Sequence, residues 1–569
     1  MTSSATGSAE QLYAALAAQR EGRVDDAAAI CRQVLAREPD QPHALLLLGL
    51  ILGKHGDAGD AATLLSRYLE LVPNDPFAGY SLGMVRQRQG DHRAALALFD
   101  AAIAGNPGLG QAFHGRGVSL HELERLDEAA VSFEQAVALE PADPTLRNNY
   151  GALLRSRERL TEALAEFDQA IALDPALAVA HCNRGVVLTA LERPQDGIVA
   201  LQTALTLDPD HVRAHLEIAE AYEATFQGDE AQRHRIEATR RRPMFVEPCL
   251  GETPLARVLI LCSPGRSDVA TRHLVDRHRF TRIQAFMLAA DEVTPAERAY
   301  LDQIPPFDLV FNSIADPDRG APYLREADAF VRRHDRPVLN PPDRIAITRR
   351  DRLVECLADI PGLLLPATRR VARAELAAMA ADAAPAPPRV VRPAGSHGGE
   401  GLRRIDRSAE LADYLGEIPF ETHYLSDYCD FQSPDGWFRK YRFIFVDREV
   451  FPYHLAISRE WKVHYWRVDM NEASWMKREE EAFLADYASV FPGGLGDAVR
   501  TVARRLDLDY AGMDCGLMPD GRVVLFEANA NMLIHLYESR ESHPYKHAYV
   551  PRIFDAAARM VERARAKLG

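Results

Sequence analysis

Three side chains with oxygen donors stand close together near the end of this 569-residue chain. Asp514 lies in the apolar run 510–517 (YAGMDCGL), and Glu527 and Asn529 lie in the run 523–531 (VVLFEANAN). Both runs are predicted to be strands joined by a Pro-Asp-Gly turn, so that the three side chains can reach one side of a hairpin. Carboxylate and amide oxygens suit a hard cation such as Mg²⁺, held between protein and a triphosphate. The alternative is a set of solvated hairpin side chains, but the flanking residues are apolar and a buried charge needs a partner.

A glycine-rich loop precedes these acids in the chain. The apolar run 389–392 leads into residues 393–401 (PAGSHGGEG), which contain four glycines. The backbone N–H groups of such a loop can close on phosphate groups. Its spacing is neither that of a P-loop nor that of a dinucleotide-binding turn. An ordinary glycine-rich hairpin is the alternative for this loop taken alone.

The elements that must position these groups alternate between strands and helices, which predicts an α/β sheet followed by a mixed α+β domain. Strands are predicted at 257–262, 307–311, 337–340, 363–371, 389–392 and 438–446, and helices at 268–277, 321–334, 344–358 and 373–381. The stretch from 244 to 254 contains proline breaks and is predicted to be a linker.

The first 245 residues repeat with a period of 34. Gly49, Gly83, Gly117, Gly151 and Gly185 are each 34 residues apart, and a proline recurs at the same interval from 39 to 243. The period and the residue types resemble the tetratricopeptide repeat, a helix–turn–helix unit. One unit cannot bury its apolar face alone, so the resemblance implies about seven stacked repeats in an all-α solenoid.

Arrays of this kind bind peptides or proteins on the face formed by the first helix of each repeat, and the resemblance implies such a partner here. The candidate contact residues are His114, Asn148, Asn149, Asn183 and Arg184. The alternative is that these are solvated polar positions. The array has no repeated Lys/Asn pattern of the kind that clamps a C-terminal carboxylate, so the partner is not identified.

Composition and charge argue against nucleic-acid-binding, secreted and membrane proteins. The formal net charge of −15 argues against general nucleic-acid binding, which needs a basic face. The N-terminus lacks a secretory signal, and the longest apolar run, 44–53, has about half the length that spans a bilayer. The seven cysteines form no CxxC pair. A reduced, cytoplasmic location without membrane partners is therefore expected.

The order of glycine loop, hinge and terminal acids resembles an ATP-grasp domain, the superfamily of D-alanine–D-alanine ligase, glutathione synthetase and biotin carboxylase. The specific part is FEANAN, residues 526–531, which matches the E-x-N metal motif of the family. The resemblance implies two Mg²⁺ ions on Asp514, Glu527 and Asn529. The expected domains are the tetratricopeptide array at 9–245, a linker at 246–254, an α/β pre-domain at 255–342 and an α+β ATP-grasp domain at 343–569.

The resemblance also implies which residues bind ATP. Arg352 and Arg392 stand where the family has lysines, and Arg442 matches the family's arginine beside the transferred phosphate, so these three are the expected catalytic cations. The implied ATP contacts are Arg352, Arg392, Gly395, Ser396, His397, Gly398, Gly399, Gly401, Tyr428, Cys429, Asp430 and Lys440. The candidate substrate contacts are His454, Ser458, Lys462 and Arg540. Solvated strand positions or aromatic packing are the alternatives for the residues between 438 and 466.

The function implied by this resemblance is an ATP- and Mg²⁺-dependent ligase. It would join a carboxylate to an amine through an acyl phosphate, with the array binding a peptide or protein partner or substrate. The carboxylate and the amine are not identified by the sequence. Three alternatives remain: an ATP-grasp phosphotransferase, an ATP-binding scaffold with little turnover, and an adaptor that uses only the repeats.

Overall fold

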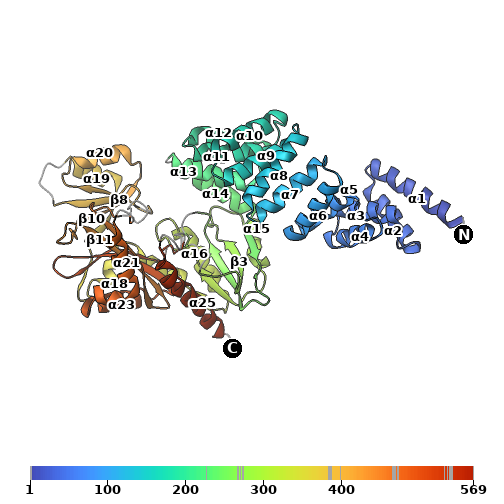
Figure 1. Cartoon of the computed structure of the whole chain (residues 1–569). Coiled ribbons are helices and arrows are strands. Elements are labelled where there is room, and N and C mark those ends of the chain that lie inside the picture. Colours follow the sequence, from blue (N-terminus) through green and yellow to red (C-terminus); the bar gives the residue numbers. More distant parts are fainter. Residues whose placement is uncertain are drawn as a thin grey trace. The chain divides into compact units, whose positions relative to one another are not determined.

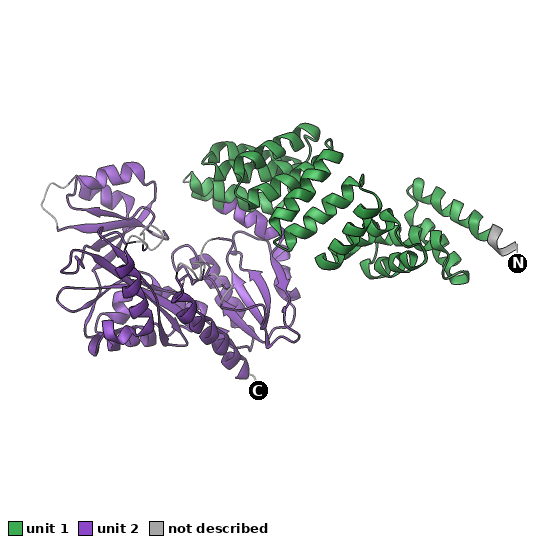
Figure 2. Ribbon diagram, in the orientation of Figure 1, with its two compact units in different colours: residues 1–231 green, residues 232–569 purple. Residues whose placement is uncertain are grey.

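The structure is a computed structural model that divides the chain into two compact units, Met1–Ala231 and Gln232–Gly569 (Figures 1 and 2). It describes every residue except 1, 2, 226, 266, 267, 270, 272, 273, 382–386, 397, 398, 464–469, 471, 472, 531, 535, 537–542, 568 and 569, and the side chains of 3–6 and 55. No helix in the described part of the chain is both long enough and apolar enough to cross a membrane.

The N-terminal part of the chain is a solenoid of paired α-helices. Its described helices are α1 (Ser3–Arg20), α2 (Val24–Arg37), α3 (Pro42–His55), α4 (Ala58–Leu71), α5 (Pro76–Arg88), α6 (His92–Gly105), α7 (Gly110–Glu122), α8 (Leu126–Leu139), α9 (Pro144–Ser156), α10 (Leu160–Leu173), α11 (Ala178–Ala190), α12 (Pro194–Leu207), α13 (Val212–Ala224) and α14 (Gly228–Arg241). The boundary between the two units falls within α14. The predicted all-α solenoid is confirmed.

The 34-residue glycine positions are sites of close helix packing within each pair. A methyl group at Gly83 would come within 2.7 Å of the Phe99 ring. The same substitution at Gly151 would come within 2.8 Å of the Phe167 ring. These separations are shorter than carbon–carbon contacts allow, so the second helix of the pair can approach only where the first has no side chain.

A parallel sheet with one antiparallel edge opens the second unit. Its strands are β1 (Met244–Glu247), β2 (Ala256–Cys262), β3 (Phe280–Phe286), β4 (Leu309–Asn312) and β5 (Val338–Leu339), in the order β1-β3-β2-β4-β5. Only the β1–β3 pair is antiparallel. Helices α15 (Pro295–Arg298) and α16 (Ala321–Val331) and a 3₁₀ turn at Ala299–Gln303 complete this domain. The predicted α/β layer is therefore present, with the edge strand β1 added.

Several predicted elements differ from the structure. Strand β1 begins in the expected linker, and β3 carries no sequence prediction at all. The predicted helix at 268–277 is absent from the described residues there, because Asp268 forms a β-bridge with Ile314 and its carboxylate accepts hydrogen bonds from Ser263. The predicted helix at 344–358 is broken into α17 (Pro342–Ile345), a 3₁₀ turn at Ala346–Thr348 and α18 (Leu353–Leu357).

A four-stranded antiparallel sheet forms a small lobe. Its strands are β7 (Thr368–Ala372), β8 (Arg389–Pro393), β9 (Arg403–Ile405) and β10 (Thr422–Asp427), in the order β7-β10-β8-β9. Helices α19 (Arg373–Ala380) and α20 (Glu410–Glu417) cover it, and their Leu376 and Tyr414 pack on Val391 and Leu425 of the strands. This buried layer fixes the strand that leads into the glycine loop.

The third sheet carries the acids predicted to bind metal. Its strands are β6 (Leu363–Leu364), β11 (Phe438–Val446), β12 (Glu449–Ser458), β13 (Tyr510–Leu517) and β14 (Val523–Asn529), in the order β12-β11-β13-β14-β6. Only β6 pairs in parallel. Helices α21 (Ser474–Ala485), α22 (Tyr487–Val490), α23 (Gly494–Leu506), α24 (Lys546–Tyr549) and α25 (Pro551–Ala566) complete the unit.

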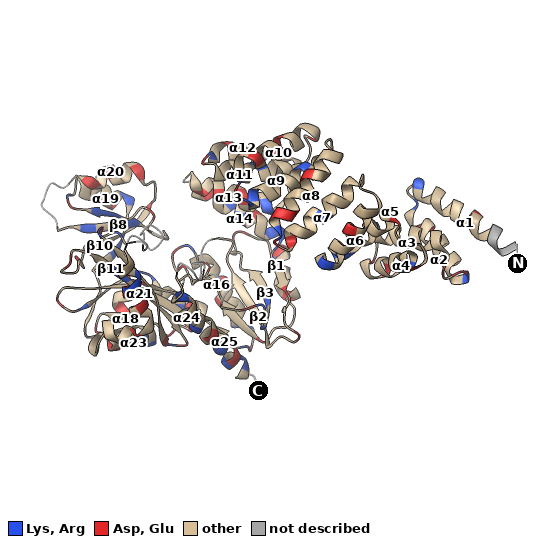
Figure 3. Ribbon diagram, viewed as in Figure 1, with Lys and Arg blue, Asp and Glu red and all other residues tan. Residues whose placement is uncertain are grey.

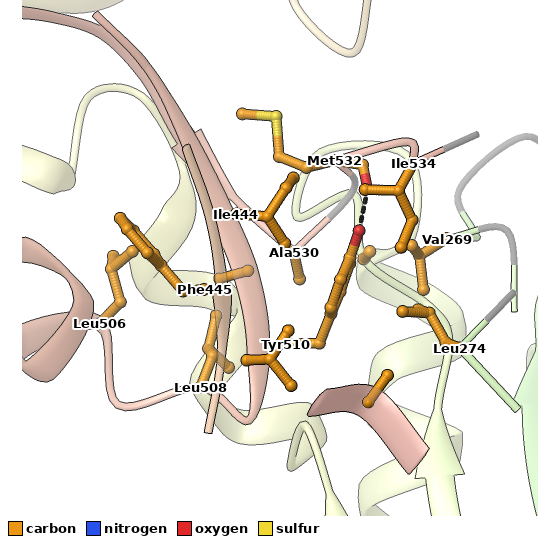
Figure 4. Packing of buried hydrophobic residues seen from close by; sticks show 14 of the residues in the cluster. Val269, Leu274, Ile444, Phe445, Leu506, Leu508, Tyr510, Ala530, Met532 and Ile534 are labelled. Carbon is orange, nitrogen blue, oxygen red and sulfur yellow. Dashed lines mark hydrogen bonds between the residues drawn. The ribbon is translucent and has the colours of Figure 1, made fainter. Parts of the chain in front are cut away.

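The first and third sheets share one hydrophobic core. Val269 and Leu274 of the first domain belong to the same cluster as Ile444 and Phe445 of β11, and the fully buried Tyr510 lies among these residues (Figure 4). The Tyr510 hydroxyl donates a hydrogen bond to the backbone oxygen of Met532. Because one cluster links them, the first domain packs against the third sheet, which contains β13 and β14.

The buried Asn340 links the first domain to the third sheet through backbone groups of Tyr510. Asn340 follows β5, and its amide nitrogen donates to the Tyr510 oxygen at 2.8 Å while its amide oxygen accepts from the Tyr510 nitrogen at 2.8 Å. Its backbone has φ of 53°, a conformation that asparagine tolerates better than most residues. The start of β13 is thereby fixed to the end of β5.

Candidate functional site

The three predicted oxygen donors lie together on one hairpin. Asp514 on β13 and Glu527 on β14 are directly opposite each other in the antiparallel register. Asn529 lies two residues further along β14, and its Nδ2 donates to Glu527 Oε1 at 2.5 Å. The alternation of a strand explains why Glu527 and Asn529 share a face. The hairpin predicted from the sequence thus brings the three side chains to one place.

Asp514 is held by two cations from the neighbouring strand β11. Arg442 makes a two-pronged contact with it, Nε to Oδ1 at 2.5 Å and Nη2 to Oδ2 at 2.8 Å, and Lys440 Nζ lies 3.0 Å from Oδ2. The aspartate is only 4% exposed. Burial acts to raise its pKa, but Arg442 and Lys440 outweigh burial and hold the pKa well below its usual range. Asp514 is therefore an anion at neutral pH.

Glu527 is paired with an arginine that the sequence did not single out. Arg350 Nη2 lies 2.5 Å from Glu527 Oε1, and Arg350 Nη1 donates to the Phe526 backbone oxygen at 3.1 Å. Burial acts to raise the pKa of Glu527, whereas Arg350 and Arg392 lower it, and the net value is about 2. The second carboxylate of the hairpin is therefore also ionised.

Arg392 extends from β8 toward the same hairpin. Its guanidinium donates to the Ser396 hydroxyl, at 3.3 Å from Nε and 3.2 Å from Nη2, and also to the Ser396 backbone oxygen. Burial, together with the like charge of Arg350, lowers the pKa of Arg392 to about 10. Arg392 thus bonds to the glycine loop while its charge acts on Glu527 of the third sheet, and it stays a cation at neutral pH.

The glycine loop has backbone that other residues adopt with difficulty. Gly395, Gly399 and Gly401 have φ of 72°, 76° and 59°. A methyl group on Gly395 would meet the Arg319 side chain at 2.8 Å. These positions need glycine both for the left-handed backbone and, at Gly395, for the space beside Arg319.

A cleft lies between the four-stranded lobe and the third sheet. Its empty volume, with the part open to solvent included, is about 1330 Å³. One wall is apolar and includes Leu353, Leu365, Val390 and Phe526. The predicted site residues that line the cleft are Arg392, Gly399, Tyr428, Cys429, Lys440, Arg442, Lys462, Asp514 and Glu527.

Charge in the described lining of the cleft is biased toward cations. Five lining side chains are basic and three are acidic, the basic ones being Arg350, Arg392, Lys440, Arg442 and Lys462. The basic residues come mainly from β8, β11 and the segments beside them, where Figure 3 colours the ribbon blue. In a chain with a net charge of −15, this excess favours a polyanionic ligand at this cleft.

Some predicted residues support the cleft without lining it. Ser396 bonds to Arg392, and Asn529 bonds to Glu527. His454 on β12 is paired in the ladder with Arg442 and is buried, and burial together with the charge of Arg442 keeps its pKa well below the usual value. Gly395 and Gly401 lie within the loop outside the cleft lining.

Other predicted residues are placed away from the cleft or lie outside the described residues. Arg352 is half-exposed and its nearest acid is Glu355, at 3.7 Å, so Arg350 and not Arg352 reaches the hairpin. Asp430 accepts from the Gln432 backbone, and Ser458 accepts from the Glu460 backbone, which makes both part of local turns. His397, Gly398 and Arg540 lie outside the described residues.

The donor set on the hairpin fits a hard divalent cation. Asp514 and Glu527 are ionised, and the Asn529 amide is adjacent, so the donors are all oxygens. The described residues contain no cluster of three or more His, Cys, Asp or Glu side chains that could hold a metal. Asp514, Glu527 and Asn529 by themselves would leave part of an octahedral Mg²⁺ shell for waters or phosphate oxygens.

The polar residues proposed for partner binding on the array bond mainly to one another. Asn183 Nδ2 donates to Asn148 Oδ1 at 2.9 Å, Asn148 Nδ2 donates to Asn149 Oδ1 at 3.1 Å, and Asn149 Nδ2 lies 2.7 Å from His114 Nε2. Asn148 and Asn183 are buried. Arg184 pairs with Asp168 at 2.6 Å. This chain of hydrogen bonds joins α7, α9 and α11, so these two asparagines stabilise the solenoid.

Comparisons with known proteins bear on the array. A family model described as tetratricopeptide repeat matches residues 12–76 and 80–132, and one described as TPR repeat matches residues 151–191. The sequence matches no curated protein.

Several solved structures resemble the chain at low identity. A chain of the Cut9–Hcn1 hetero-tetramer of APC/C is 19% identical, with a TM-score of 0.37. The match covers 40% of this chain and 45% of that chain, so this chain spans less than half the length of the matched protein. YrrB, a TPR protein with an unusual peptide-binding site, is 24% identical over 32% and 95% of the two chains, with a TM-score of 0.28. MamA from Desulfovibrio magneticus RS-1 is 20% identical over 30% and 96%, with a TM-score of 0.28. The family matches identify residues 12–191 as carrying tetratricopeptide repeats.

Proposed function

We propose that residues 255–569 form an ATP-grasp ligase that uses ATP and Mg²⁺ to join a carboxylate to an amine. The observation that supports this most directly is the convergence of two different sheets on one cleft. Asp514 and Glu527 reach the cleft from the third sheet, while Arg392 and the glycine loop reach it from the small lobe. A triphosphate between the two would meet cations on one side and metal-binding oxygens on the other.

In the proposed site the nucleotide would lie along the whole length of the cleft. The apolar wall suits an adenine ring, and Tyr428 and Cys429 lie where a hinge between lobes would contact it. Arg350, Arg392 and Arg442 would neutralise phosphate charge, each as a planar fork able to bind two oxygens. Mg²⁺ held by Asp514, Glu527 and Asn529 would supply further neutralisation of the phosphates.

The proposed reaction needs no protein nucleophile. An oxygen of the substrate carboxylate attacks the γ-phosphorus and ADP leaves, giving an acyl phosphate. The lone pair of an amine then attacks the acyl carbon, phosphate leaves with the original carboxylate oxygen, and the amine loses a proton. The residues of the cleft contribute by positioning the reactants and by stabilising the charge that accumulates on the phosphoryl oxygens.

The array would bring a peptide or protein to this reaction. Tetratricopeptide repeats in residues 12–191 are of a type that binds polypeptides, and they precede the cleft in the same chain. The proposal therefore includes a polypeptide that is a substrate or a partner of the ligase.

Transfer of ¹⁸O tests the ligase proposal. The full chain is incubated with ATP, Mg²⁺, an amine mixture and a panel of ¹⁸O-carboxylates, namely amino acids, dicarboxylates and acidic peptides. A ligase places one ¹⁸O of the active acid in inorganic phosphate, whereas a phosphotransferase leaves the phosphoryl group on its product and releases no labelled phosphate. ADP formation without either product would identify an ATPase, and no ADP formation would leave only a nucleotide-binding scaffold.

Two variants of one hairpin separate the metal role from general effects. Asp514→Asn removes a charge that the proposal places on the metal, and turnover should fall by about 100-fold or more. Asp520→Asn changes an exposed acid in the turn of the same hairpin, where the partner is Arg522, and turnover should stay unchanged. Equal turnover in wild type and Asp514→Asn would contradict the proposed metal site.

A further inference from the structure

The small lobe of strands β7 to β10 has a hydrophobic core of its own. Its buried residues, among them Leu376, Val391, Tyr414 and Leu425, form a cluster that shares no buried member with the core of the first and third sheets in the described part of the chain. The chain enters this lobe at β7 and leaves it after β10. Because apolar packing does not merge the two cores, the position of the lobe depends on polar contacts at its surface.

The loop that follows β4 in the first domain makes such a contact. The Tyr424 hydroxyl on β10 donates to the Asp318 carboxylate, at 2.9 Å from Oδ1 and 2.7 Å from Oδ2, and Arg370 Nη2 on β7 lies 3.8 Å from Oδ1. Tyr424 is 1% exposed and the Asp318 side chain 11%. Burial raises the pKa of Asp318 and the Tyr424 hydrogen bond lowers it, so the contact favours the carboxylate. A first-domain acid is therefore bound inside the lobe.

The shape of this loop is fixed by its own hydrogen bonds. The buried Asp316 accepts at Oδ1 from the backbone nitrogens of Asp318, at 2.7 Å, and of Arg319, at 3.2 Å. The Arg319 side chain lies against Gly395, where an added methyl group would come within 2.8 Å of it. Residues 316–319 thus touch the lobe twice, at β10 and at the start of the glycine loop.

The sheet of the lobe connects this contact to Arg392. Tyr424 is directly opposite Arg370 of β7 and Arg392 of β8 in the two antiparallel registers. Residues that are directly opposite in such ladders project from the same face of the sheet. Tyr424 is therefore the middle member of a row of three, with Asp318 bound to it and with Arg392, which donates to Ser396 of the glycine loop, beside it.

We propose that Asp318 and Tyr424 are positioning residues that hold the small lobe on the first domain and thereby place Arg392 for the triphosphate. Arg392 belongs to the lobe, whereas Asp514 and Glu527 belong to the third sheet, which shares its core with the first domain. Fixing the lobe to the first domain therefore fixes Arg392 relative to the hairpin acids. A lobe that is already in place binds nucleotide more tightly than one that must first be ordered. The inference deepens the proposed function and rests on its nucleotide site.

Hydrogen–deuterium exchange of the full chain without nucleotide tests the contact itself. Tyr424→Phe keeps the ring and removes only the hydroxyl that donates to Asp318, so peptides from β8 and β10 should exchange about 10-fold faster while those from β13 and β14 stay unchanged. The matched control is Tyr414→Phe in the same lobe. Tyr414 is also fully buried, but its hydroxyl bonds to no described residue, so its variant should exchange like wild type.

Nucleotide affinity then tests the action through Arg392. The ATP analogue AMP-PNP with Mg²⁺ and adenosine are each titrated as competitors of a fluorescent ATP analogue. Tyr424→Phe should weaken AMP-PNP by about 10-fold and adenosine by less than about 2-fold, because adenosine has no phosphate for Arg392 to meet. In the Arg392→Ala background, Tyr424→Phe should weaken AMP-PNP no further. Tyr414→Phe should bind both compounds like wild type.

A second pair of variants approaches the contact from the first domain. Asp318→Ala should reproduce the effects of Tyr424→Phe and replaces it if that variant does not fold. Asp318→Asn keeps an oxygen that can accept from Tyr424, so it should retain most of the affinity for AMP-PNP that Asp318→Ala loses.

The possible results separate the inference from the proposed function. Unchanged exchange in both Tyr424→Phe and Asp318→Ala would overturn the inference, whether or not nucleotide binds. Faster exchange with unchanged affinity for AMP-PNP, or an equal loss for adenosine, would overturn the action through Arg392. Failure of wild type to bind AMP-PNP would refute the proposed function and the positioning role with it. Selective loss of AMP-PNP in the two variants, with Tyr414→Phe unaffected, would establish Asp318 and Tyr424 as positioning residues.

Discussion

Replacing Glu527 with Gln should destabilise the second unit in a way that depends on pH. The carboxylate lies 2.5 Å from Arg350 and is 21% exposed, and its pKa is about 2. Gln keeps the shape and one acceptor oxygen but leaves Arg350 facing a neutral group. The partly buried guanidinium then loses the anion that offset its desolvation.

The size of the effect follows from the pKa. The pKa of Glu527 falls from the ordinary 4.5 to about 2, and each unit of pKa difference corresponds to ~1.4 kcal/mol, which gives about 3.5 kcal/mol in favour of the folded state. Because the folded pKa is the lower one, this contribution is complete above pH ~4.5 and is lost as pH falls toward 2. The Gln variant lacks the contribution at pH 7 and should not lose it again in acid.

Tryptophan fluorescence isolates the relevant unit. The four tryptophans are Trp437, Trp461, Trp466 and Trp475, all outside the array, so guanidinium unfolding followed by their emission reports on the second unit alone. The free energy of unfolding is measured for wild type and Glu527→Gln at pH 7 and at steps down to pH 3. Arg350→Met and the double variant complete a cycle that gives the coupling between the two residues.

The control is Asp520→Asn, which removes an exposed partner of Arg522 on the same hairpin. Exposed ion pairs contribute little to stability, so no change in unfolding is expected from it. A loss below about 1 kcal/mol in Glu527→Gln at pH 7, or zero coupling in the cycle, would refute the reasoning that Arg350 and Glu527 form a net stabilising pair.

Three further predictions follow from individual residues. Gly395→Ala should lower the free energy of unfolding by about 1 kcal/mol or more and weaken nucleotide binding, because Gly395 has φ of 72° and the Arg319 side chain occupies the space that a methyl group would need. Chemical unfolding measures the first effect and calorimetric titration the second. His423 is buried with no described partner at either ring nitrogen, and burial lowers its pKa to about 4. The wild-type protein should therefore lose stability as the pH falls from 6.5 to 4, whereas His423→Phe should have a higher melting temperature and should not show that loss. Lys440→Met should raise the affinity for Mn²⁺ alone, measured by electron paramagnetic resonance, because Asp514 loses a competing cation.

Regular elements with a strong local signal were predictable from the sequence. The 34-residue period predicted the helix pairs of the array, and the apolar runs predicted the strands β11, β13 and β14 at the positions where the structure has them. Strand β3 was missed because its burial alternates irregularly, and β1 was missed because it is short and the prolines on either side of it indicated a linker. The helix expected at 268–277 is not seen in the described residues, because Asp268 contacts Ser263 and forms a β-bridge with Ile314 at the start of that segment.

The candidate site shows where sequence reasoning reaches its limit. The hairpin acids were found because their chemistry is unusual inside an apolar strand, and the alternation of β14 dictates which of them share a face. Choosing among Arg349, Arg350 and Arg352 requires the path of the backbone. The 3₁₀ turn that ends at Thr348 breaks the expected helix and directs Arg350 to Glu527, while Arg349 pairs with Asp351. No spacing rule in the sequence encodes that break.

The ion pairs of the cleft give a physical reason why metal and nucleotide should enter together. Arg442 and Lys440 occupy the oxygens of Asp514, and Arg350 occupies an oxygen of Glu527, so a bare divalent ion must displace cations that are already well placed. A polyanion offers those side chains new partners and frees the carboxylate oxygens at the same step. If the proposed function holds, each carboxylate that loses its arginine or lysine gains the metal as counter-ion, so a triphosphate carrying its own Mg²⁺ should bind this cleft more tightly than either component alone.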